Sequence, residues 1–142
     1  MPALWSSPEK DETMARTPER NSHRRAERHG KRAEQIAAWW LRAKGYRILE
    51  SRYKTSVGEI DLIVRRGQRI AFVEVKARPS REQALESLSV HQRRRIIRAA
   101  EAWIARENLQ GRLPRNYDIS FDMVLVVPGR IPYHLSGLFD AN

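Results

Sequence analysis

The chain has 142 residues, no cysteine and a formal net charge of +10. This length suits one domain with a sizeable core, and the lack of cysteine excludes disulfides and thiolate metal sites and favours a cytoplasmic setting. No apolar run approaches the roughly 20 residues of a membrane span, and the N-terminus lacks the apolar core of a signal peptide. We therefore expect a soluble, cytoplasmic protein with no membrane partner.

The charge is unevenly distributed. Residues 1–22 carry a net charge of −1 and show no hydrophobic period, whereas the rest of the chain holds 24 basic and 13 acidic residues. We expect a disordered tail over 1–22 and a single domain over 23–142. A basic domain usually binds a polyanion, and nucleic acid suits it better than lipid because no amphipathic anchor is present. A merely well-solvated basic surface is the alternative.

The first expected element is a helix from Ser22 to Gly45. Its first half is crowded with cations, which are unfavourable at a helix N-terminus, so they either contact phosphates or lie on an exposed first turn: Arg24, Arg25, Arg28, Lys31 and Arg32. Residues at helical spacing predict its buried stripe, namely Ala33, Ile36, Ala37, Trp40 and Leu41. Trp39 and Trp40 are expected at the core and its edge rather than as a base-stacking platform.

Three strands should follow, over 46–54, 58–64 and 69–77, and the last two form a hairpin around the polar turn 65–68. Residues 79–88 predict a loop or one short helix. Ser89 then caps a second amphipathic helix, with Gln92 completing a capping box, and this helix ends near 108–111. Its early turns carry arginines that could lie along a phosphate backbone: Arg93, Arg94, Arg95 and Arg98. Strands over 119–127 and 131–135 close the chain.

Carboxylates interrupt the apolar hairpin at Glu59, Asp61 and Glu74. If the loop holds an even number of residues, with Val64 opposite Arg69, all three acids and the following lysine lie on one face. Asp61 is then diagonal to Glu74, within reach of its side chain. An odd loop would bury Asp61 among apolar residues, so the pattern favours the even loop. The other face is then wholly apolar, with Ile60, Leu62, Val64, Ala71, Val73 and Val75.

Acids on an apolar sheet are costly to bury unless positive charge lies between them. Mg²⁺, with Mn²⁺ as a substitute, prefers oxygen ligands, which Asp61, Glu74 and the backbone carbonyl of Val75 could supply. Lys76 could orient or deprotonate a water, or neutralise charge on a phosphate. A structural salt-bridge network around Lys76 is the alternative.

Asp122, in the fourth strand, is expected to be a hydrogen-bonded structural acid paired with an arginine. The sequence has no phosphate-binding glycine loop, zinc-protease motif or nucleophile elbow.

The hairpin GEIDLIV…FVEVKAR resembles the signature of the YraN-like family of uncharacterised bacterial proteins. The similarity runs from about Ala33 to Phe139 and includes Ala33-Glu34, Gly45-Tyr46, the basic second helix and Phe121-Asp122. That family is placed in the PD-(D/E)xK nuclease superfamily and resembles archaeal Holliday-junction resolvases. The resemblance implies an α/β, restriction-endonuclease-like core, a mixed sheet of about five strands flanked by two main helices. It also implies a metal site at Asp61, Glu74 and Lys76, with Glu34 as a third carboxylate.

Two positions depart from the family's pattern. Gln92 stands where a lysine is common, and Ser120 stands where an arginine usually precedes Phe-Asp. Our leading hypothesis is a Mg²⁺-dependent endonuclease acting on nucleic acid, with branched DNA favoured over RNA. A non-catalytic nucleic-acid-binding module with the same fold and a basic assembly protein on a ribonucleoprotein are the alternatives. Symmetric cleavage of a junction would require a homodimer.

Overall fold

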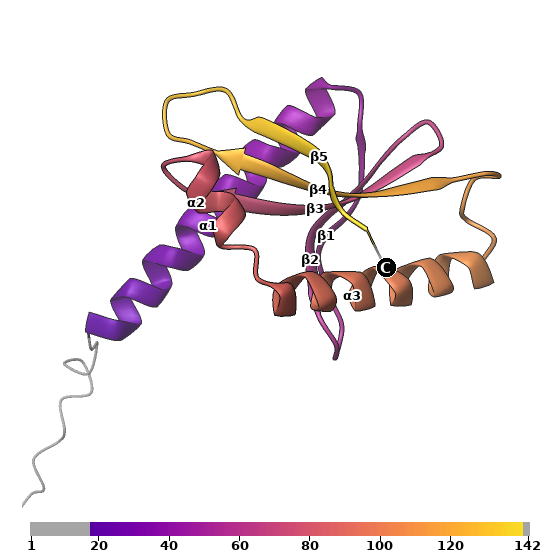
Figure 1. Cartoon of the computed structure of the whole chain (residues 1–142), viewed down its shortest axis with the longest axis horizontal. Coiled ribbons are helices and arrows are strands. Elements are labelled where there is room, and N and C mark those ends of the chain that lie inside the picture. Colours follow the sequence, from indigo (N-terminus) through magenta and orange to yellow (C-terminus); the bar gives the residue numbers. More distant parts are fainter. Residues whose placement is uncertain (1–17, 141–142) are drawn as a thin grey trace, which may run out of the picture.

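The computed structural model describes residues 18–140, and over 18–29 it describes the backbone alone. The architecture is α/β, a mixed five-stranded sheet with helices on both faces (Figure 1). The elements are α1 (Pro18–Ala43), β1 (Arg47–Lys54), β2 (Glu59–Arg66), β3 (Arg69–Ala77), α2 (Arg81–Glu86), α3 (Val90–Leu109), β4 (Asp118–Val126) and β5 (Tyr133–Phe139).

The strands lie in chain order, β1-β2-β3-β4-β5. Neighbours are antiparallel except β3 and β4, which are parallel. A parallel pair needs a crossover connection, and α2 with α3 supplies it. The predicted fold class is confirmed, and the arrangement is compatible with a restriction-endonuclease-like core.

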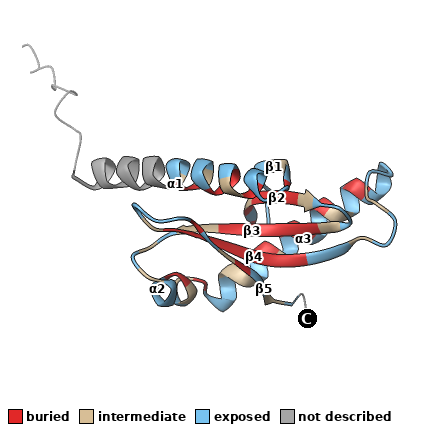
Figure 2. Ribbon diagram, turned by 90° about the horizontal axis from the view of Figure 1, so that it is seen from above, coloured by how far each residue is buried: buried red, intermediate tan, exposed pale blue. Residues whose placement is uncertain are grey.

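Two hydrophobic cores lie on opposite faces of the sheet (Figure 2). Side chains alternate along a strand, so in β3 Ala71 and Val73 face α1 while Ile70 and Phe72 face α3. Trp103 of α3 meets the ring of Phe72 edge-on, with ring centroids 5.8 Å apart. The middle strands are therefore buried on both faces.

The β2–β3 hairpin has the predicted parity but a different register. Val64 pairs with Ala71, and the last pair before the turn is Arg66 with Arg69. Gly67, at a φ of 63°, permits this two-residue turn, which is tighter than the predicted four-residue loop. The predicted pairing of Val64 with Arg69 was therefore wrong by two residues, although the even loop was right.

Ile60 does not share a core with Leu62, contrary to the predicted apolar face. Ile60 packs in the α3-side core and Leu62 in the α1-side core. At the same level of the facing strand, Arg52 has a φ of 53°. The start of β2 is therefore turned relative to the rest of the strand.

Helix α1 presents most of the predicted stripe to the sheet. Ala33, Ala37 and Leu41 are buried as predicted, and Ala38 is buried with them, whereas Ile36 is 41% and Trp39 65% exposed. Small residues let the helix approach the sheet closely, so the larger side chains face outward, and the core position expected for Trp39 was wrong. The helix begins at Pro18, inside the segment 1–22 predicted as a tail; residues 1–17 lie outside the described part.

Across the described residues, no helix is long and apolar enough to cross a membrane.

Candidate active site

Asp61 and Glu74 come together where β2 separates from β3. The last backbone pair of this ladder is Leu62 with Val73, and continuing the register sets Asp61 level with Glu74. Beyond that pair, the Oδ2 of Asp61 accepts a hydrogen bond of 2.8 Å from the backbone N–H of Val75. The side chain of Asp61 thus takes the place of a strand partner, which fixes its carboxylate beside that of Glu74.

The two carboxylates lack sufficient positive charge around them. Glu74 is 8% exposed, and Asp61 is half-buried. Burial raises the pKa of Asp61 to about 8, and the charge of Glu74 adds to the effect. Burial also raises the pKa of Glu74, although the Lys76 ammonium opposes it. Near pH 7 the pair therefore holds a proton unless another cation neutralises it.

Two side chains hold one oxygen of Glu74. The Nζ of Lys76 lies 3.2 Å from Oε1 of Glu74, and the Nε2 of Gln92 donates to the same oxygen at 2.9 Å. Ser89 caps α3 as predicted, by accepting from the backbone N–H of Gln92 at 3.1 Å. The Gln92 side chain, however, points toward the sheet and bonds Glu74 of β3 instead of the N-terminus of its own helix. Sequence analysis missed this role because the same residue also fits a capping box.

Glu34 lies near the pair, and its charge helps to raise the pKa of Asp61. Its Oε2, however, accepts a hydrogen bond of 2.7 Å from the Nε of Arg52. Within the described part of the chain, no group of three or more acidic or histidine side chains is gathered closely enough to hold a metal ion. The structure does not bring Glu34 into such a group, so its part as a third carboxylate stays a prediction.

Glu59 and Val75 occupy the edges of the site. Glu59 is exposed and pairs with Lys54 of β1, not opposite Glu74 as the predicted register implied. Its charge still raises the pKa of Glu74, after the larger effect of burial. The backbone N–H of Val75 is engaged by Asp61, while a ligand role for its carbonyl stays a prediction.

Two hollows open beside these acids. One, of about 350 Å³, lies against α3 and is lined by Glu59, Glu74, His91, Gln92, Arg95 and Ile96. The other, of about 380 Å³, lies against α1 and is lined by residues that include Lys31, Glu34, Arg42 and Arg52. Both combine carboxylates with cationic side chains, which suits a ligand with phosphate groups.

The predicted nucleic-acid contacts fall on both helices. On α1, Lys31 and Arg32 are exposed, while the side chains of Arg24, Arg25 and Arg28 lie outside the described residues. On α3, Arg95 lines the hollow of Glu74. Arg93, Arg94 and Arg98 line another hollow, of about 570 Å³, and Arg93 lies over the ring of Phe139 at 5.7 Å.

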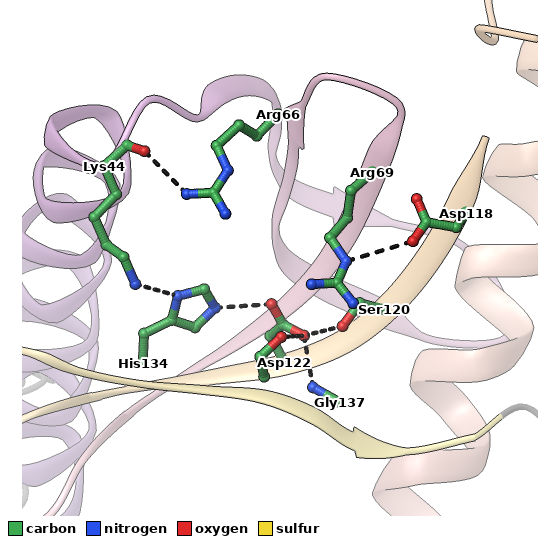
Figure 3. A network of polar contacts seen from close by, with 9 residues as sticks. Lys44, Arg66, Arg69, Asp118, Ser120, Asp122, His134 and Gly137 are labelled. Atoms are coloured by element: carbon green, nitrogen blue, oxygen red, sulfur yellow. Dashed lines mark hydrogen bonds and ion pairs between the residues drawn. The ribbon is translucent and has the colours of Figure 1, made fainter.

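Asp122 anchors a separate polar network (Figure 3). It is 1% exposed, and its partner is His134, with Nε2 2.8 Å from Oδ2, rather than the predicted arginine. Burial alone would raise the pKa of Asp122, but hydrogen bonds from His134, Ser120 and Gly137 hold it below its usual value. The Nζ of Lys44 lies 2.8 Å from the other ring nitrogen of His134. The network ties β5 to β4 and to the end of α1, which is a structural role.

Residues 33–126 match the profile of Uncharacterised protein family UPF0102. A UPF0102 protein of Chelativorans sp. (strain BNC1) is 48% identical over 123 residues, covering 87% of this chain and 96% of its own. One of Maricaulis maris is 50% identical over 114 residues, covering 80% of this chain and 86% of its own. One of Agrobacterium fabrum is 44% identical over 126 residues, covering 89% of this chain and all of its own. The similarity thus extends well beyond the hairpin.

Proposed function

Since the chain belongs to the uncharacterised protein family UPF0102, the YraN-like family expected from its hairpin, we propose that it is a Mg²⁺-dependent nuclease hydrolysing phosphodiester bonds. The description of the family assigns no activity, so the proposal rests on the site. The observation that carries it is the pair of adjacent, largely buried carboxylates of Asp61 and Glu74 in a strongly basic protein, with Lys76 ion-paired to Glu74. DNA, branched or otherwise irregular, is the substrate that the family resemblance favours.

The donor set suits a hard divalent cation. Mg²⁺ commonly takes one or two protein carboxylates and completes its shell with waters and a substrate phosphate. Asp61 and Glu74 would provide these carboxylates. Burial, and after it the charge of Glu74, raises the pKa of Asp61, and a bound cation would favour the ionised form of both side chains. When bound, such an ion polarises a phosphoryl oxygen and lowers the pKa of a bound water. Mn²⁺, with the same oxygen preference, would substitute.

The chain's own residues have distinct parts in this proposal. Lys76, ion-paired with Glu74 at 3.2 Å, carries an ammonium that can neutralise charge developing on the phosphate and orient the attacking water. Gln92 is a positioning residue because it fixes the Glu74 oxygen that Lys76 also contacts. Arg95 lines the same hollow and can bind a backbone phosphate next to the one being cleaved.

The experiment is a cleavage assay with the full chain, Mg²⁺ or Mn²⁺, and labelled four-way junctions, nicked duplex, linear duplex and RNA. We expect cleavage of irregular DNA, loss of cleavage in EDTA, and loss in Lys76→Ala. Lys76→Ala, purified in parallel, also controls for a contaminating nuclease. If wild type and Lys76→Ala behave identically on every substrate, the enzymatic proposal fails.

A non-catalytic nucleic-acid-binding module is the second candidate. It is favoured by the pairing of Glu74, whose Oε1 has both Lys76 and Gln92 as partners, as in a structural polar network. This candidate predicts salt-dependent binding of nucleic acid that EDTA does not alter. Binding with and without EDTA, measured by fluorescence anisotropy beside the cleavage assay, distinguishes the two.

A further inference from the structure

Arg52 has an unusual backbone conformation at the edge of the site. Its φ is 53°, and among the described non-glycine residues only Asn116 shares a positive φ. This left-handed region is costly for a residue with a long side chain, whereas asparagine tolerates it. The flanking residues still pair regularly with β2, Ser51 with Leu62 and Tyr53 with Ile60. Such a conformation within a paired strand is typical of a functional position.

Arg52 in this conformation contacts Glu34. The Nε of Arg52 lies 2.7 Å from Oε2 of Glu34, with side chains that are 40% and 19% exposed. The hydrogen bond to Glu34 raises the pKa of Arg52, and the charges of Asp61 and Glu59 add to this effect. Arg52 therefore lies within the electrostatic field of the acid site without contacting the Asp61–Glu74 pair.

The carboxylate of Glu34 cannot pair with Arg52 and bind a divalent cation through the same oxygen. A guanidinium on its carboxylate occupies an oxygen that a divalent cation would need and repels that cation. Arg52 is the more exposed partner and lines the hollow of about 380 Å³ on the α1 side. It can consequently leave Glu34 for a ligand in that hollow without disturbing either core. A phosphate group is the ligand that a planar guanidinium binds best.

We propose that Arg52 is a displaceable counter-ion of Glu34: in the free protein it holds the carboxylate, and on binding nucleic acid it moves to a backbone phosphate. Glu34 then becomes available to the divalent cation held by Asp61 and Glu74. This inference rests on the proposed function and adds a coupling between its two ligands. Because coupling between two binding sites is reciprocal, nucleic acid raises the affinity for the cation, and the cation raises the affinity for nucleic acid.

The test is a calorimetric titration of Mg²⁺ into the full chain and its variants. Arg52→Asn removes the guanidinium while keeping a residue that tolerates the left-handed backbone. We expect it to bind Mg²⁺ about 5- to 10-fold more tightly than wild type, as follows from removing one nearby cation. In a Glu34→Gln background the same substitution should give no gain. Arg42→Gln is the matched control, because Arg42 lines the same hollow and its removal lowers the net charge equally; it should leave the affinity nearly unchanged.

A second readout is binding to a non-cleaved duplex in EDTA, measured by fluorescence anisotropy at several salt concentrations. Arg52→Asn should reduce the log-log salt slope by about 0.9, the value for one lost phosphate contact. The inference is overturned if Arg52→Asn and Arg42→Gln bind Mg²⁺ alike, or if the gain persists with Glu34→Gln. A wild-type protein that binds no Mg²⁺ would instead refute the metal site itself, and circular dichroism of each variant identifies any loss of fold.

Discussion

Gly58 lies directly against the backbone of Arg95: a Cβ at Gly58 would stand 2.2 Å from the carbonyl oxygen of Arg95. Gly58 precedes the acid-bearing strand β2, while Arg95 belongs to α3, the helix that also supplies Gln92. The contact therefore holds the start of β2 against α3. The β1–β2 turn lies next to the same helix (Figure 1). A glycine is required here for close approach and not for a turn conformation.

Gly58→Ala is expected to lower the free energy of unfolding by about 2 kcal/mol, because the added methyl group must displace a helix backbone. Urea denaturation followed by circular dichroism measures the change. Gly30→Ala in α1 is the matched control, since a Cβ there meets nothing within 4 Å and alanine favours a helix. Equal stability of Gly58→Ala and wild type would show that α3 does not constrain this turn.

Without divalent cations, the stability of the protein should fall as the pH rises from about 4 to about 8. The pKa of Asp61 is raised from 3.8 to about 8 in the folded state. Between these two values the folded state keeps a proton on Asp61 that the unfolded state has lost. The stability gained from the protonated side chain is therefore lost as the pH rises through the folded-state pKa. Asp61→Asn should remove most of the decline. Thermal unfolding in EDTA across this range measures it, with Glu86→Gln as the control, because Glu86 is exposed and lies on α2. Parallel curves for Asp61→Asn and wild type would contradict the assignment.

Gln92→Leu should reduce cleavage about 10-fold or more, because residues that orient a metal-binding carboxylate typically contribute this much. Its amide donates to Glu74 at 2.9 Å, and leucine keeps the size without the donor. His91→Ala, in the same hollow but on no carboxylate, is the control. The rate of cleavage and the Mg²⁺ affinity are both measured. A normal rate in Gln92→Leu would contradict the positioning role of Gln92.

His134→Ala should lower the free energy of unfolding by about 3 kcal/mol at pH 7, because it leaves the buried Asp122 carboxylate without the hydrogen bond from the His134 ring. The pKa of Asp122 is lowered in the folded state, so its contribution is present above the usual value of 3.8 and is lost as pH falls through the folded-state value. The difference between wild type and variant should therefore shrink in acid. Urea denaturation at pH 7 and pH 3 measures it, with exposed His91→Ala as the control; an unchanged difference at both values would contradict the role of ionised Asp122.

The hairpin could be predicted from sequence because its information is local. Alternation of apolar and acidic residues fixes which side chains share a face, and from Leu62 to Val73 the structure has that parity. The register was wrong because Gly67 allows a two-residue turn where four polar residues suggested a longer loop. The change of face at Ile60 lies beside Arg52, whose left-handed backbone is in the facing strand and is not revealed by any pattern within β2.

The polar partners in the site could not be predicted for a different reason. Arg52 with Glu34, and Gln92 with Glu74, each join residues 18 positions apart on different elements, and periodicity carries no information about such contacts. The stripe of α1 was predicted correctly except at one edge. Hydrophobicity favoured Ile36 over Ala38 there, whereas close packing against the sheet favours the smaller residue.

The central claim, that Asp61 and Glu74 form a divalent-cation site, is tested most directly by calorimetric titration of Mg²⁺ into wild type and Asp61→Asn. We expect wild type to bind one ion per chain and, near pH 7, to release about one proton, because the pKa of Asp61 is raised to about 8 and ligands must be deprotonated to bind. Buffers of different ionisation enthalpy measure that proton. Asp61→Asn should show no binding. Equal titration curves for the two proteins, or no binding to either, would contradict the claim.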